Sequence, residues 1–170
     1  MTTSAAPVTA QAPSGTPVRV GVVGTGLIGR SHLAGMAGRP DTVIAAICEP
    51  RPDAADAGVL EVTSRGGLPP VVEPAWERFI AVTAAEQRLD VVVLFTPHAL
   101  HFEQARSSLE AGLDVLLEKP MVTDAGQAEE LIRTRDRTGR LLVVAFNGSL
   151  SPRVRAAASM IRDVTSAVSS

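Results

Sequence analysis

Residues 18–29 read VRVGVVGTGLIG, an apolar run that ends in three glycines. The run is β-branched and nearly uninterrupted, as expected for a parallel strand that helices cover on both faces. Gly24, Gly26 and Gly29 have the spacing G-x-G-x-x-G. In such a turn the first glycine permits a sharp bend, the second lets the backbone approach a pyrophosphate, and the third allows a helix to pack closely on the strand. The stretch therefore predicts a dinucleotide-binding turn, against the alternative of an accidental glycine loop.

The surroundings of the glycines favour the binding turn. Leu27 and Ile28 open a helical pattern, so backbone N–H groups would face an anion there. Glu49 lies twenty residues beyond Gly29, at the end of the next apolar run. An acidic residue at this place accepts hydrogen bonds from the adenosine ribose, although a solvated strand-end carboxylate is the alternative. Because Glu49 would repel a 2′-phosphate that Arg51 could bind, the sequence favours NAD narrowly and leaves NADP open.

Composition excludes several classes of protein. The chain has 170 residues, 45% hydrophobic and 20% charged, with a net charge of -2. These values suit one principal globular domain and argue against a nucleic-acid or membrane-surface role. The single cysteine, Cys48, excludes an internal disulfide and a cysteine-based metal cluster, and we expect it in the core. With no signal-peptide pattern and no run near the roughly 18 apolar residues of a membrane span, we expect a cytoplasmic protein.

Short apolar runs alternate with helical patterns along the chain. The expected strands are residues 18–23, 42–48, 71–72, 91–95, 114–117 and 141–146. The expected helices follow the glycine turn, form a short stretch near Ala54, and span 74–87, 98–112 and 124–138. We expect the 74–87 helix to have Trp76, Phe79, Ile80 and Val82 on its buried side. The 124–138 helix is expected to bury Ala128, Leu131 and Ile132. The alternation predicts an α/β fold with a doubly wound parallel sheet of six strands in the order 3-2-1-4-5-6.

Ligands of such a sheet lie outside the carboxyl ends of its strands. This rule selects the glycine turn, Glu49, residues 96–98 and residues 118–120, which we expect to converge on one crevice. Lys119 stands out because fifteen of the sixteen basic residues are Arg and it is the only lysine. Lysine, unlike arginine, exchanges a proton near neutrality when its surroundings lower its pKa. We expect Lys119 to be catalytic, against the alternative of a chance surface lysine.

These motifs together resemble the Gfo/Idh/MocA oxidoreductase family, which includes glucose-fructose oxidoreductase and inositol dehydrogenase. The resemblance rests on the glycine turn, on Thr96-Pro97 with His101 four residues further on, and on the Glu-Lys-Pro motif at residues 118–120. It implies a Rossmann domain that binds NAD(P) and the oxidation of a sugar, polyol or related hydroxyl compound. Lys119 would lie near the reacting hydroxyl, with Thr96 and Pro97 near the nicotinamide half. The expected cofactor-binding residues are Gly24, Gly26, Leu27, Ile28, Gly29, Glu49, Arg51, Thr96, Pro97, His98, His101, Glu118 and Lys119.

The chain departs from the family in two respects. His98 stands where the family commonly has Asn, and His98 and His101 do not form a convincing metal set. Residues 1–16 are mostly Ala, Thr, Ser and Pro without charge, so we expect a disordered leader there, followed by a Rossmann domain over 17–149. The family continues into a substrate domain, and we expect residues 150–170 to be a truncated start of it. Two functions therefore remain. The first is an oxidoreductase that takes a small sugar or polyol as its substrate and could form a homo-oligomer. The second is a nucleotide-binding module without turnover.

Overall fold

The computed structural model describes residues 15–146 together with residues 151, 152, 156 and 159. The expected leader up to residue 14, and most of the expected helix and tail after Phe146, lie outside the described residues. In the part described, six strands form one parallel sheet in the order β3-β2-β1-β4-β5-β6, which confirms the predicted α/β topology. The chain divides into two compact units, one up to Val91 and one from Val92.

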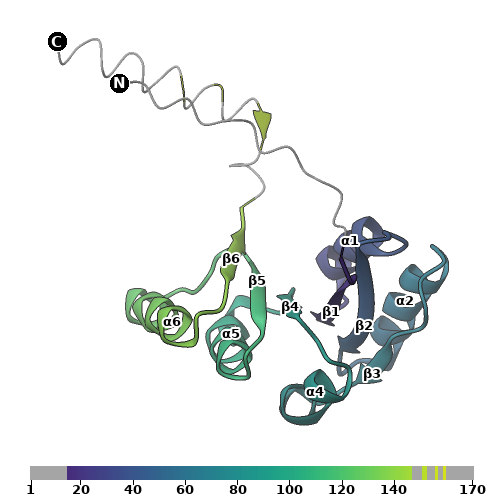
Figure 1. Cartoon of the computed structure of the whole chain (residues 1–170), viewed down its shortest axis with the longest axis horizontal. Helices are drawn as coiled ribbons and strands as arrows, with labels where there is room; N and C mark the ends of the chain where they lie inside the picture. The colour runs from purple at the N-terminus through teal and green to yellow at the C-terminus, as the bar shows by residue number, and fades with distance from the viewer. Residues whose placement is uncertain (1–14, 147–150, 153–155, 157–158, 160–170) are drawn as a thin grey trace. The chain divides into compact units, whose positions relative to one another are not determined.

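The first unit holds β1 (Val18–Val23), β2 (Thr42–Cys48) and β3 (Val71–Glu73). Both pairings are parallel, with Val23 beside Cys48 and Cys48 beside Glu73. The strands carry much of this unit's core, because the inner residues of β1 and β2 are almost entirely shielded from solvent. Figure 1 shows the two long helices of the unit beside these strands, α1 (Leu27–Met36) and α2 (Pro52–Thr63), which also contact each other.

Helix α2 is longer than the short stretch expected near Ala54. Its Pro52 occupies the first turn, where a proline N–H is not needed, and four residues at helical spacing are buried. Three of the four are Ala or Gly, the set being Ala54, Ala55, Gly58 and Val62. Small side chains give little hydrophobic contrast, so periodicity alone indicates only part of the helix.

The helix expected over 74–87 is interrupted by a π-helical segment. The structure has α3 (Trp76–Arg78), the π segment η1 (Phe79–Thr83) and α4 (Ala84–Glu86). Phe79 is buried as predicted, and Trp76, Ile80 and Val82 are half-buried. A π turn takes up about one extra residue, which rotates the following positions and brings Thr83 inward.

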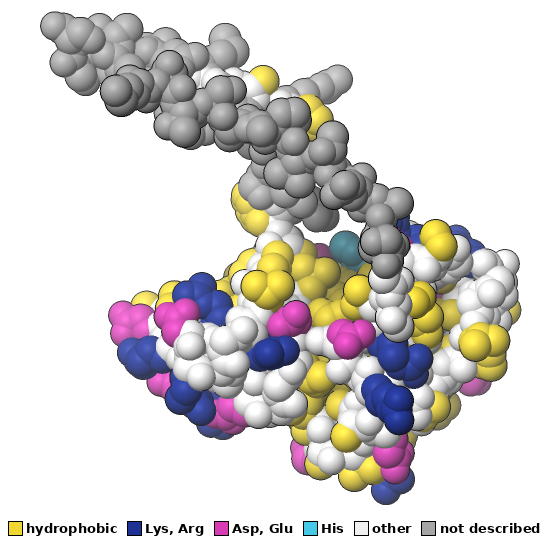
Figure 2. Space-filling model, viewed as in Figure 1, with side chains coloured by type: hydrophobic (Ala, Val, Ile, Leu, Met, Phe, Trp, Pro, Cys, Tyr) yellow, Lys and Arg dark blue, Asp and Glu magenta, His cyan; other side chains and the backbone are white. Residues whose placement is uncertain are grey.

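The second unit begins within β4 (Val91–Leu94) and continues through η2 (His98–Leu100), α5 (His101–Glu110), β5 (Asp114–Glu118), α6 (Ala125–Thr138) and β6 (Leu142–Ala145). The expected 98–112 helix therefore starts as one 3₁₀ turn. Strands β5 and β6 pair in parallel, with Leu117 beside Val144. Figure 2 shows hydrophobic side chains over β6 and charged side chains over α6.

Helix α6 has distinct signals at both ends. Asp124 caps its start by accepting a hydrogen bond of 3.0 Å from the Gln127 N–H. Gly139 ends it with φ +67°, the left-handed conformation that glycine adopts without a Cβ penalty. Leu131 is buried as expected, whereas Ile132 is 43% exposed, which corrects the prediction. Thr134 takes the inner position instead, because residues three apart, not one apart, share a helix face.

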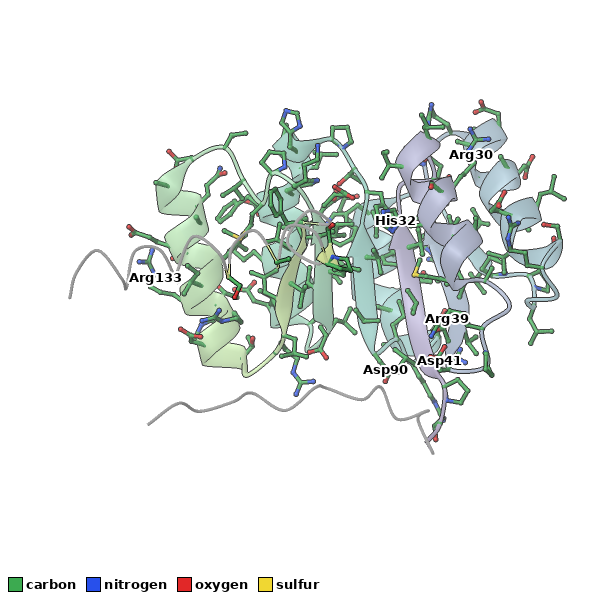
Figure 3. The ribbon with its side chains drawn as sticks, turned by 90° about the horizontal axis from the view of Figure 1, so that it is seen from above. Arg30, His32, Arg39, Asp41, Asp90 and Arg133 are labelled. Carbon is green, nitrogen blue, oxygen red and sulfur yellow. The ribbon has the colours of Figure 1, made fainter. Side chains whose placement is uncertain are left out.

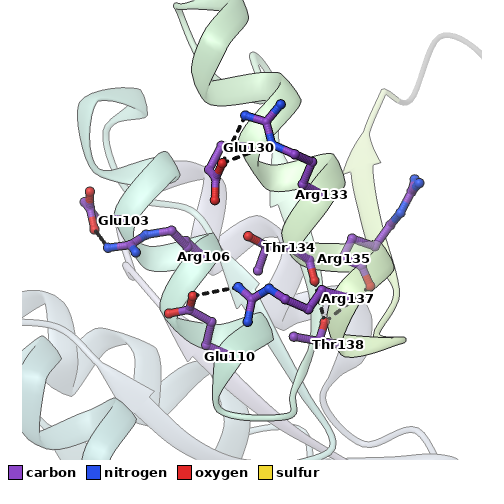
Figure 4. Close-up of polar contacts among 9 residues, drawn as sticks. All are labelled: Glu103, Arg106, Glu110, Glu130, Arg133, Thr134, Arg135, Arg137 and Thr138. Atoms are coloured by element: carbon purple, nitrogen blue, oxygen red, sulfur yellow. Dashed lines mark hydrogen bonds and ion pairs between the residues drawn. The ribbon is translucent and has the colours of Figure 1, made fainter.

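Polar side chains line the contact between α5 and α6 (Figure 4). Arg137 of α6 reaches Glu110 of α5 at 3.0 Å, while Arg106 pairs with Glu103 within α5 at 2.8 Å. Such exposed ion pairs contribute at most about 1 kcal/mol each, so apolar packing stabilises the pair of helices. In the part of the chain that the structure describes, no helix combines the length and apolar character needed to cross a membrane.

Candidate dinucleotide site

The glycine turn leaves β1 at Val23 and starts α1 four residues later, at Leu27. Gly24 has φ +87°, a conformation that side chains other than glycine rarely adopt, and its N–H donates to the Cys48 carbonyl at 2.9 Å. Gly26 precedes α1, and a Cβ built on it meets no atom within 4 Å. The space above Gly26 is therefore open to a ligand that needs to touch the backbone.

The start of α1 offers backbone donors to an anion. Gly26 supplies no side-chain cap, and the first turn of α1 holds no acidic residue. Leu27 and Ile28, both predicted here, are exposed at 78% and 51%, while Gly29 is buried against the fold. Figure 3 places Arg30 toward the start of α1, away from the Arg39–Asp41 pair at the opposite end of this unit. The positive end of the helix dipole thus stands without a protein carboxylate in its own first turn.

Glu49 lies at the end of β2 and is only 5% exposed, so it is not a solvated strand-end carboxylate. Its Oε2 accepts a hydrogen bond from the Thr25 N–H at 2.9 Å, and the Thr25 hydroxyl oxygen lies 3.3 Å from it. Its Oε1 accepts from the Arg51 N–H at 3.2 Å and the Arg51 Nε at 3.1 Å. A carboxylate has about four acceptor positions. The N–H groups of Thr25 and Arg51 and the Arg51 Nε occupy three of them.

Charge at this point is balanced within the protein. Burial disfavours the ionised form of Glu49, but the guanidinium and N–H of Arg51 and the N–H of Thr25 hold its pKa below the ordinary value. The Arg51 side chain is 62% exposed and meets Glu49 through Nε, which leaves its two terminal nitrogens toward solvent. A phosphate that approaches Arg51 therefore meets donors before it meets the carboxylate.

Thr25 is a supporting residue that sequence reasoning missed. It is 1% exposed, and its hydroxyl donates to the Ala54 carbonyl at 2.7 Å. A Cβ on Gly58 of α2 would lie 2.7 Å from the Thr25 methyl carbon. Glu49, Ala54 and Gly58 therefore fix the residue between the first two glycines. Nothing in the sequence indicated this contact, because Gly58 lies in α2 and Thr25 in the glycine turn, and only the fold brings the two together.

In the second unit, Thr96 follows β4 and is held through both of its polar ends. Its hydroxyl donates to Oε1 of Gln104 at 2.6 Å, and its carbonyl lies 2.9 Å from Nε2 of His101. Pro97 and His98 come next and are exposed, with His98 in the 3₁₀ turn η2. Gln104 is 6% exposed and was not predicted, since a lone glutamine in a helix carries no pattern.

His101, predicted to contact the cofactor, is 1% exposed and bound to its own chain. Its Nδ1 lies 2.9 Å from the Pro120 carbonyl oxygen, and its Nε2 lies 2.9 Å from the Thr96 carbonyl oxygen. A ring nitrogen donates to a carbonyl only when it carries a proton. When the ring is an imidazolium, both contacts are therefore hydrogen bonds. When the ring is neutral, only the nitrogen that carries the proton donates, and one contact is a hydrogen bond.

Glu118 ends β5, and Lys119 follows it at an exposed position. The Lys119 N–H donates to Oε2 of Glu118 at 2.9 Å, which orients the strand end. Among the residues that the structure describes, no ion pair engages the Lys119 ammonium, and no group of three or more His, Cys, Asp or Glu could hold a metal ion. Convergence of both units' residues on one crevice stays a prediction.

The chain belongs to the Gfo/Idh/MocA oxidoreductase family, whose model describes an NAD-binding Rossmann fold and matches residues 18–146. A dTDP-3,4-didehydro-2,6-dideoxy-alpha-D-glucose 3-reductase from Actinomadura kijaniata is 35% identical over 85% of this chain and 41% of its own length. An inositol 2-dehydrogenase from Rhizobium meliloti is 28% identical over 86% of this chain and 41% of its own.

Solved structures give the same result. A 3-ketoreductase from Actinomadura kijaniata, in complex with NADP and TDP-benzene, has a TM-score of 0.73 and 30% identity over 87% of this chain and 43% of its own. A scyllo-inositol dehydrogenase from Lactobacillus casei with bound NAD(H) and scyllo-inositol has a TM-score of 0.74 at 22% identity and supports the fold. The chain spans less than half the length of these relatives. The cofactor class is NAD(P), as predicted.

Proposed function

We propose that this chain is the NAD(P)-binding domain of an oxidoreductase that acts on a hydroxyl carbon of a sugar, polyol or inositol. The observation that carries the proposal is the open space over Gly26 at the uncapped start of α1. A pyrophosphate needs close backbone approach and N–H donors. The open space over Gly26 allows the approach, and the first turn of α1 provides the N–H groups. The nicotinamide, when bound, supplies or accepts the hydride.

The preference between NAD and NADP follows from Glu49 and Arg51. The ribose of NAD would find three of the acceptor positions of Glu49 occupied, and it would have to displace the Arg51 side chain to reach the two on Oε1. A 2′-phosphate would meet the terminal nitrogens of Arg51 without such a displacement. These contacts support NADP binding at least as tight as that of NAD.

Lys119 is the residue we assign to proton transfer. The residue is exposed at the end of β5, and among the described residues no ion pair holds its ammonium, so the group can turn toward a substrate. General acid–base catalysis by one positioned group accounts for about 10²- to 10⁴-fold in rate. Thr96, Pro97 and His98 would face the nicotinamide half, in line with the family resemblance. Substrates named for the relatives are sugars and inositols.

The experiment follows NAD(P)H absorbance in the protein that carries this domain, with a panel of inositols, polyols and sugars. Lys119→Met should lower turnover about 10²- to 10⁴-fold and leave NADPH affinity within a factor of two or so. Lys119→Arg keeps the positive charge, but a guanidinium does not give up a proton near neutrality, so turnover should be lost as well. Full turnover by Lys119→Arg would show that charge alone suffices and would remove the assignment.

A further inference from the structure

We propose that His101 and Gln104 are positioning residues that clamp the ends of β4 and β5 together, so that Thr96 and Lys119 present fixed backbones to the cofactor and substrate. Both lie on one face of α5, at the first and fourth residues of the helix. The clamp itself stands on contacts within the second unit, whereas its consequence for hydride transfer rests on the proposed function.

The first part of the clamp is the His101 ring. One ring spans two carbonyls, that of Thr96 after β4 and that of Pro120 after β5, each at 2.9 Å. These carbonyls lie past the ends of the strands, where sheet hydrogen bonds no longer satisfy them. In its imidazolium form this ring, which is 1% exposed, therefore donates to both carbonyls just beyond the ends of the two strands.

The second part is the amide of Gln104. It accepts the Thr96 hydroxyl proton at 2.6 Å while being 6% exposed itself. Thr96 is thus fixed through its hydroxyl and its carbonyl by two residues one helical turn apart. A threonine held in this way has one backbone orientation and one rotamer, which suits a residue that would lie beside the nicotinamide ring.

The link to Lys119 is its neighbour in the chain. Pro120 follows Lys119 directly, and its carbonyl is the atom that Nδ1 of His101 binds. The Lys119 stem is long and flexible, so the reach of its ammonium depends on where its backbone is anchored. Misplacement of a catalytic group by about 1 Å can cost about 10²-fold in rate. His101 acts at this point without touching the reacting atoms.

A merely structural histidine would tolerate any replacement that fills the space, and amide side chains distinguish the two roles. Asn places its NH₂ near the position of Nδ1, so His101→Asn retains the Pro120 arm. Gln places its NH₂ near the position of Nε2, so His101→Gln retains the Thr96 arm. His101→Leu removes both ring nitrogens. Ser108→Ala is the matched control, because Ser108 is fully buried on the same helix and its hydroxyl bonds only the Gln104 carbonyl.

The test measures amide hydrogen exchange by NMR for residues 95–98 and 118–122 in each full-length variant. His101→Asn should speed exchange about tenfold in the first segment only, His101→Gln in the second only, and Ser108→Ala in neither. If His101→Leu does not fold, the two amide variants still decide the matter. Equal changes in both segments for Asn and Gln, or none, would overturn the clamp.

A second readout concerns binding. The His101 variants should weaken NADPH about tenfold or more but leave ADP-ribose, which lacks nicotinamide, within about twofold. Equal losses for both ligands would mean general destabilisation and would overturn the positioning role. If the wild-type protein binds neither ligand, the proposed function fails, and the exchange pattern alone then decides the clamp.

Discussion

Gly58→Ala should destabilise the protein, although alanine is the better helix former. Gly58 lies inside α2, where replacement by Ala ordinarily gains about 1 kcal/mol. Here the new Cβ would lie 2.7 Å from the Thr25 methyl carbon, 3.1 Å from the Thr25 Cβ and 3.3 Å from the Ile47 Cδ1. Thr25 cannot easily move away, because Glu49 and the Ala54 carbonyl hold it. Such overpacking costs about 1–3 kcal/mol.

Gly35→Ala is the matched control for this substitution. Gly35 lies in α1, and a Cβ there meets no atom within 4 Å, so the change should be neutral or stabilise by up to about 1 kcal/mol. The difference between the two variants removes the propensity term and reports the clash, about 1–3 kcal/mol. Urea unfolding with an unchanged m-value measures it. Equal free energies of unfolding for the two variants would refute the claim that Gly58 buttresses the glycine turn.

Further predictions concern three other positions. Cys48 should resist thiol reagents at pH 8 until the protein is unfolded, because burial and then Glu73, Glu49 and Glu77 raise its pKa to about 12; rapid labelling of the native protein would contradict this. The pKa of Glu49 is lowered in the fold, so its contribution to stability is present above the ordinary value of 4.5 and is lost as the pH falls further. Glu49→Gln should therefore destabilise at pH 7 more than at pH 3 in urea titrations, and an equal loss at both would count against the contacts. Gly139→Ala should cost about 1–2 kcal/mol in thermal unfolding through φ +67° alone, since a Cβ there meets nothing within 4 Å.

The sequence predicts strand bounds well where apolar runs are short and abruptly ended. Residues 18–23 and 42–48 coincide with β1 and β2, and Gly139 ends α6 as expected. Helix faces are harder to predict, because a single π turn or a shift of one position changes which residues are buried. Ile132 shows this: it is apolar at a plausible position, yet it is 43% exposed and Thr134 is buried in its place.

Site residues divide in the same way. The glycines and Glu49 have a spacing typical of a dinucleotide-binding turn, so the pattern alone predicts them. Thr25, Gln104 and the contacts of His101 depend on which backbone atoms the fold brings near a side chain. No spacing along the chain encodes those distances. The internal use of the Glu49 carboxylate is likewise visible only in three dimensions.

The most direct test of the account is calorimetric titration of NADPH and NADH into the wild-type protein and into Gly26→Val. The valine side chain would extend into open space, so the variant should fold, as thermal unfolding can verify. It would occupy the place where the backbone meets the pyrophosphate, and binding of both cofactors should fall by at least about a hundredfold. Gly35→Val, on the same helix, should bind like the wild type. Undiminished affinity in a folded Gly26→Val protein would contradict the assignment of the glycine turn as the dinucleotide site.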